Sequence, residues 1–165
     1  MQSRNIHLIN TNRSDTLDNS TIINKLVRKH GTRDPFKIAK GEGITVLYEE
    51  LGTINGYYNK VLRMKQIHIN HNLSEIEKHF TCAHELGHAM LHKDQNTNFL
   101  LSSTLMSVEK LEREADEFAL DLLVSSDDIE KYMDYDTSEI KDVFGKCAML
   151  MNRILEIHYK KGDAL

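Results

Sequence analysis

The stretch Phe80-Thr-Cys-Ala-His84-Glu85-Leu-Gly-His88-Ala-Met-Leu-His92 decides how the rest of the chain is interpreted. On a helix that advances about 100° per residue, His84 and His88 lie about 40° apart, with Glu85 beside them. The rest of the circumference is almost entirely apolar, which indicates a buried helix with one polar stripe. Because buried polar groups need partners, the stripe predicts a binding site.

The spacing His-Glu-x-x-His favours a metal at that site. Two imidazoles one helical turn apart suit a tetrahedral zinc ion, and the neighbouring carboxylate can accept a proton from a zinc-bound water. With nine histidines in the chain, chance alone would produce the pattern about 4% of the time. A catalytic zinc takes three protein ligands, so a third ligand is expected elsewhere.

The helix expected over residues 108–123 offers two glutamates for that role. Glu112 shares its helical face with small and apolar residues, which predicts that its side chain points inward. Glu114 falls on a charged face and is expected at the surface. An inward carboxylate needs a cation as partner, which makes Glu112 the predicted third ligand. Asp116, one turn further, is placed to accept a hydrogen bond from the free ring nitrogen of a ligand histidine.

The remaining sequence predicts an α+β fold with a small antiparallel sheet, a zincin-like active-site helix and a helix-rich C-terminal half. Ser20 is expected to cap a first helix that ends at Gly31, and Asp34 to cap a second. Runs rich in Ile, Tyr and Val predict the strands, at 44–48, 53–58 and 64–70. Helical spacing then continues from Ser74 almost to the end, with C-terminal helices over 136–159.

Size and composition narrow the class of protein. A chain of 165 residues fits one domain, which we expect over residues 18–160 after a loosely ordered segment at 1–17. The net charge of -4 without a long basic stretch argues against direct nucleic-acid binding. No apolar run suits a membrane span or signal peptide, and two cysteines are too few for a disulfide framework, so a cytoplasmic protein is expected.

Two matching segments carry a family resemblance. The pattern Phe80-x-x-Ala-His84-Glu85-Leu-Gly-His88-x-x-Leu-His92, followed by Leu111-Glu112-x-x-Ala115-Asp116-x-Phe118-Ala119-x-x-Leu122-Leu123, resembles the ImmA/IrrE family of metallopeptidases. The resemblance implies a gluzincin-like site in which His84, His88 and Glu112 bind zinc and Glu85 is the general base. The family commonly has Pro soon after the Leu-Leu pair, whereas this chain reads Val124-Ser125-Ser126; that difference affects the helix end and not the chemistry.

The resemblance also implies a substrate class. It points to an endopeptidase that cuts a helix-turn-helix transcriptional repressor of a prophage, a mobile element or a stress response. The alternative is a zinc-containing regulator that disables the repressor by binding alone, against which the intact Glu85 argues. Tyr57, Tyr58 and His92 stay open as groups that could stabilise the oxyanion, with core packing expected for at least one tyrosine and a helix-end position for His92.

Overall fold

The computed structural model describes residues 19–92 and 105–124. The segment expected to be loose at 1–17, the helices predicted over 136–159 and the predicted C-terminal end of the domain lie outside these residues. Among the helices that the structure does describe, none has the length and apolar character that crossing a bilayer requires.

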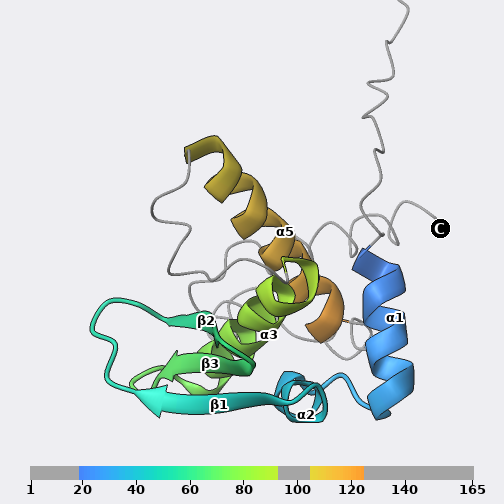
Figure 1. Cartoon of the computed structure of the whole chain (residues 1–165), viewed down its shortest axis with the longest axis horizontal. Helices are drawn as coiled ribbons and strands as arrows, with labels where there is room; N and C mark the ends of the chain where they lie inside the picture. The colour runs from blue at the N-terminus through green and yellow to red at the C-terminus, as the bar shows by residue number, and fades with distance from the viewer. Residues whose placement is uncertain (1–18, 93–104, 125–165) are drawn as a thin grey trace, which may run out of the picture.

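The described elements form one layer of strands and two layers of helix on one side of it. Figure 1 shows α3 lying between the sheet and α5, and the predicted α+β fold is confirmed. In chain order the elements are α1 (Asn19–His30), α2 (Pro35–Gly41), β1 (Ile44–Glu49), β2 (Gly56–Val61), β3 (Met64–Asn70), α3 (Glu75–Leu91) and α5 (Leu105–Leu123). Helix α1 already includes Asn19, so Ser20 lies within the helix and is not its cap.

The sheet is mixed, and the prediction of an antiparallel sheet is wrong for one of its two strand pairs. Strand β3 lies in the centre, antiparallel to β2 but parallel to β1. The chain reaches β2 by crossing the end of β3, and Asn70 holds that crossing segment. Its side-chain amide donates to the carbonyls of Gly52 and Ile54 at 3.0 Å each, and its backbone N–H donates to Asn55 at 2.8 Å. This crossing leaves β2 at an edge of the sheet.

Alternation along β3 separates the two faces of the sheet. Ile67 and Ile69 are fully buried on the face covered by α3, where Tyr58 of β2 joins them. His68 lies on the opposite face, where its Nδ1 is 3.0 Å from a carboxylate oxygen of Glu49 and its ring stacks on Tyr57 at 4.3 Å. The polar stripe of α3 and the His68 side chain therefore lie on opposite sides of the sheet.

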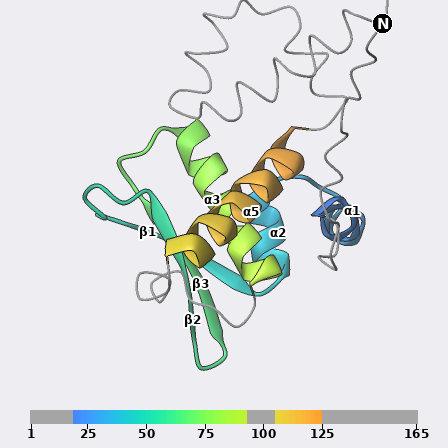
Figure 2. The same ribbon diagram turned by 90° about the horizontal axis from the view of Figure 1, so that it is seen from above.

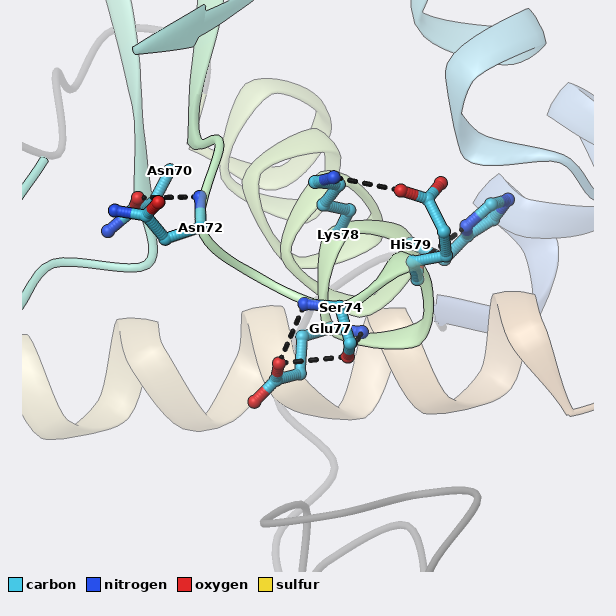
Figure 3. Close-up of polar contacts among 7 residues, drawn as sticks. Asn70, Asn72, Ser74, Glu77, Lys78 and His79 are labelled. Carbon is cyan, nitrogen blue, oxygen red and sulfur yellow. Dashed lines mark hydrogen bonds and ion pairs between the residues drawn. The ribbon is translucent and has the colours of Figure 1, made fainter. Parts of the chain in front are cut away.

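A capping box fixes where α3 begins (Figure 3). The Ser74 hydroxyl accepts a hydrogen bond from the backbone N–H of Glu77 at 3.3 Å, and the Glu77 carboxylate accepts one from the Ser74 N–H at 2.9 Å. These two bonds satisfy donors that a helix start otherwise leaves unpaired. The start of the helix sets the direction in which His84 and His88 point.

Arg33 fixes the C-terminal end of α5. Its guanidinium donates to the carbonyls of Asp121 and Leu122 at 3.0 and 3.1 Å. These carbonyls belong to the last turn of α5, where a helix leaves its final carbonyls without the usual backbone donors. The segment between α1 and α2 thereby holds α5 in place against α3.

Glu42 makes the stability of the helical layer dependent on pH. Its carboxylate lies 2.7 Å from Lys29 and 2.7 Å from His30. The hydrogen bond from Lys29, helped by that of His30 and opposed by burial, lowers the pKa of Glu42 below its usual value. A carboxyl with a lowered folded pKa stabilises the fold above its unfolded pKa of about 4.3 and loses that effect as the pH falls through the folded value.

We therefore predict that Glu42→Gln lowers the free energy of unfolding at pH 7 by up to about 1 kcal/mol. The difference from wild type should shrink to nothing as the pH falls below the usual range of glutamate, as followed by urea unfolding at several pH values. Glu109→Gln, on the exposed face of α5, is the control. A difference for Glu42→Gln that stays constant from pH 7 to pH 3 would contradict the prediction.

Candidate metal centre

The centre is built where α3 and α5 come closest. A Cβ atom added to Gly87 would lie 3.1 Å from the Phe118 ring and 3.2 Å from the Ala115 Cα, closer than almost all real Cβ contacts. Figure 2 shows α5 crossing α3. The two histidines flank Gly87 on α3, and the acidic residues Glu112 and Asp116 flank Ala115 on α5. This contact therefore brings the two halves of the centre together.

Three side chains converge there. The Nε2 atoms of His84 and His88 are 3.1 Å apart, and the two oxygens of Glu112 lie 3.3 Å from one Nε2 each. Donors that each sit about 2.0–2.2 Å from a tetrahedral ion are about 3.3–3.6 Å from one another. The donor atoms of His84, His88 and Glu112 thus have nearly the separations that a tetrahedral ion requires, and all lie within 4.8 Å of one another.

Asp116 orients His84. Its carboxylate accepts a hydrogen bond from Nδ1 at 2.8 Å, as predicted, which turns Nε2 toward Glu112. Burial lowers the pKa of His84, but the hydrogen bonds with Asp116 and Glu112 outweigh burial and raise that pKa to about 10. The group of donors therefore demands a positive charge, which either a proton on His84 or a metal cation can supply.

The exposure of the two glutamates differs from expectation. Glu112 was expected to be buried, yet 45% of its side chain is exposed, whereas for Glu114, expected at the surface, the value is 22%. Glu114 lies 3.5 Å from His92 and 3.7 Å from Lys110. Glu112 does face both histidines, and their hydrogen bonds hold its pKa well below the usual range. Helical periodicity gave the right face, but exposure also depends on neighbouring segments, which periodicity does not include.

Glu85 lies beside these donors and is 5% exposed. Its carboxylate accepts a hydrogen bond from the backbone N–H of Tyr58, on β2. Its second oxygen, Oε2, is buried and has no hydrogen-bond partner among the residues that the structure describes. Burial raises the pKa of Glu85, although the charges of His84 and His88 oppose this effect. An unpaired buried oxygen is costly, so this carboxylate is prepared to take up a proton or a polar ligand.

Comparison with known proteins identifies the family. The family model described as the IrrE N-terminal-like domain matches residues 39–153. The chain belongs to the ImmA/IrrE family. It is 43% identical over 103 residues to the uncharacterized immunity region protein 2 of Bacillus phage phi105, a match that covers 62% of this chain and 65% of that protein. It is also 32% identical over 115 residues to Metallopeptidase ImmA of Bacillus subtilis (strain 168), covering 68% of this chain and 67% of ImmA.

The chain thus spans about two thirds of the length of the curated relatives that it matches. Membership of a metallopeptidase family agrees with a group of donors suited to a metal. The matched region includes β1, β2, β3, α3 and α5. All residues that contribute donors to the centre of this ImmA/IrrE member therefore lie within the family match.

The other residues considered at the sequence level have distinct positions. His92 closes α3, since its backbone N–H donates to the His88 carbonyl at 2.9 Å, which confirms the predicted helix end. Tyr58 is 1% exposed in the core, as expected for at least one tyrosine. The Tyr57 ring lies against His68 on the face of the sheet away from α3, so an oxyanion role for Tyr57 does not fit.

Two contributors to the centre were missed at the sequence level. Gly87 carries a signal that could have identified it, because a glycine inside an otherwise apolar helix often marks a close approach of another backbone. The N–H of Tyr58 carries no such signal, because every non-proline residue has a backbone donor. Only the placement of β2 against α3 shows that this donor reaches Glu85.

The contact at Gly87 generates a prediction for Gly87→Ala. Alanine favours a helix by about 1 kcal/mol over glycine, but overpacking costs about 1–3 kcal/mol, and the Ala115 backbone cannot rotate out of the way. We expect a Tm no higher than that of wild type and an affinity for zinc lowered about 10-fold, measured by competition with a chromogenic chelator. A higher Tm with unchanged zinc affinity would show that α5 moves aside without disturbing Glu112.

Proposed function

We propose that this chain is a zinc-dependent endopeptidase that hydrolyses a peptide bond in a protein target. The observation that carries the proposal is the position of Glu85 beside three converging metal donors: its buried carboxylate has one anchored oxygen and one that finds no partner among the described residues. A site that only held a metal would have no use for such a carboxylate. The family to which the chain belongs, and the name of its relative Metallopeptidase ImmA, support the same reaction class.

The donor set favours zinc in a catalytic role. Two imidazole nitrogens and one carboxylate oxygen are a common zinc environment. Structural zinc sites usually have four protein ligands, whereas catalytic sites have three and leave one position open for water or substrate. His84, His88 and Glu112 are the three ligands that we propose.

Glu85, Tyr58 and Asp116 would have different roles in the hydrolysis. When bound, zinc supplies Lewis acidity, which polarises the scissile carbonyl and lets water attack near neutral pH. Glu85 takes the proton from the attacking water on its unpartnered Oε2 and later delivers it to the leaving amine. The Tyr58 N–H keeps the Glu85 carboxylate in place during both transfers, and Asp116 keeps His84 oriented.

The edge strand β2 offers a way to bind the substrate. Among the strands that the structure describes, β2 pairs with β3 alone, and its residue Tyr58 contacts Glu85. A peptide that adds to a sheet edge forms main-chain hydrogen bonds and stays extended. A segment of the target added beside β2 would pass the metal centre in an extended form that exposes its peptide bonds.

The target that we propose is a helix-turn-helix transcriptional repressor in the cytoplasm. The family resemblance implies such a target, and the names of the two relatives, an immunity region protein of a phage and a metallopeptidase, agree with a role in a prophage or mobile element. The competing function is inactivation of the repressor by binding without cleavage. Glu85 distinguishes cleavage from inactivation by binding, because only hydrolysis requires the proton transfer that Glu85 would perform.

Metal content tests the ligand set. Purified wild type should hold one zinc per chain by mass spectrometry, and Glu112→Ala should lower the affinity for zinc by at least about 100-fold, since even residues behind the ligands contribute 10–100-fold. Glu114→Ala, two residues away on the same helix, is the matched control and should keep the metal. Loss of zinc with Glu114→Ala alone would move the third ligand to Glu114.

Glu85→Gln tests the reaction. The variant should bind zinc as wild type does but cleave the repressor at least about 100-fold more slowly, which is the lower range for general acid–base catalysis. Cleavage is followed by gel electrophoresis and the new terminus is identified by mass spectrometry. If Glu85→Gln relieved repression in cells as fully as wild type, inactivation by binding alone would be the better description.

A further inference from the structure

The tip of the hairpin formed by β2 and β3 combines exposed apolar side chains with positive charge. The sequence there is Lys60-Val-Leu-Arg-Met-Lys65, which we call the basic apolar tip. The exposed fractions are 47% for Val61, 88% for Leu62 and 60% for Met64. Single exposed apolar residues are common, but three within four residues form a patch that needs an explanation.

Leu62 is unfavourable for the fold in two respects. Val61 pairs with Met64, so the hairpin turns through the two residues Leu62 and Arg63. Leu62 has φ 57°, a left-handed conformation that no other non-glycine residue adopts among the described residues. A two-residue turn with positive φ at its first position favours glycine there. Leucine at this position is therefore both strained and exposed, and features of this kind cluster at functional sites.

The charge of the hairpin differs from that of the whole chain. Between Glu50 and Glu75 the sequence contains no acidic residue, whereas Lys60, Arg63 and Lys65 lie at the tip. Lys65 donates to the backbone carbonyl of Glu42 at 3.4 Å. The acceptor in this contact is neutral, so the contact does not neutralise the charge of Lys65. In a chain with a net charge of -4, this hairpin is a local positive surface that suits an acidic partner.

The tip continues the edge strand that reaches the metal centre. Tyr58 contacts Glu85, and Val61 follows it three residues later on β2. At about 3.3 Å per residue, the tip begins roughly 10 Å from that contact along the strand. A peptide added to the edge of β2 would therefore meet the basic apolar tip within a few residues of the bond to be cleaved.

We propose that the basic apolar tip is a docking site for an extended segment of the substrate protein in which acidic and apolar residues alternate. The apolar side chains would pack on Val61, Leu62 and Met64, and the carboxylates would face the tip's positive charges. Main-chain pairing with β2 gives affinity to any extended peptide, whereas the tip adds selectivity. This inference rests on the proposed function, because it names the substrate feature that the same site selects.

Binding can be measured without cleavage on the zinc-loaded full chain carrying Glu85→Gln. The probes are two fluorescein-labelled 12-residue peptides, one with alternating Leu and Glu and one with Lys in place of every Glu, followed by fluorescence anisotropy. We expect the Glu peptide to bind at least about 10-fold more tightly, with a preference that falls as salt rises. Equal affinity for the two peptides would overturn the proposal.

Leu62→Gly separates a docking role from a structural one. Glycine removes the strain and the exposed side chain, so Tm should rise while affinity for the Glu peptide falls about 5-fold or more. Arg63→Glu should also weaken binding of the Glu peptide. The matched controls are Ile76→Ser and Lys25→Glu, which change an exposed apolar and an exposed basic residue elsewhere. Unchanged affinity, or a lower Tm for Leu62→Gly, would overturn the proposal.

Three further outcomes keep the inference distinct from its alternatives. If single-stranded DNA bound more tightly than the Glu peptide and Arg63→Glu abolished that binding, the tip would be a nucleic-acid contact and the proposal would fail. If a Leu62→Gly chain with an intact Glu85 cleaved its target as fast as wild type, the docking site would fail while the proposed function stood. If the Glu peptide bound at the tip but wild type cleaved no target, the docking site would stand while the proposed function failed.

Discussion

Gly87 brings the backbones of α3 and α5 so close, at Ala115, that a larger side chain at Gly87 has no room without a shift. The metal centre depends on this contact, because its histidines come from one helix and its acidic residues from the other. The start of α3 and the last turn of α5 are fixed independently, by the Ser74–Glu77 capping box and by Arg33. The helix packing therefore determines the separations of the donor atoms.

A second constraint is charge. Glu85 and Glu112 lie near both histidines and Asp116 contacts His84. Three carboxylates gathered in a partly buried site repel one another unless a cation is present. The high pKa of His84 and the low pKa of Glu112 are two consequences of the same requirement. A divalent ion meets it with two positive charges, whereas a proton on His84 provides one. The helix packing that orients the donor atoms thus also favours binding of a divalent metal ion over protonation of His84.

The sequence was sufficient to predict the helices of the centre and the residues that face each other across them. Regular periodicity carries that information, as Asp116 beside His84 shows. It was not sufficient for the sheet, because the direction of β1 relative to β3 depends on the path of residues 50–55, which hydrophobic alternation does not encode. It also failed for the exposure of Glu112 and Glu114, because exposure depends on which segments cover a helix.

The error about the sheet bears directly on function. In an antiparallel meander, the second strand would lie between the other two, and both of its hydrogen-bonding edges would be occupied. Because Asn70 instead holds a crossing segment over the end of β3, β3 takes the central place and β2 keeps an outer edge. That edge contains the N–H that anchors Glu85 and leads to the tip at Leu62. One buried asparagine therefore links the topology of the sheet to the position of β2 as an outer strand, among the described strands, beside the metal centre.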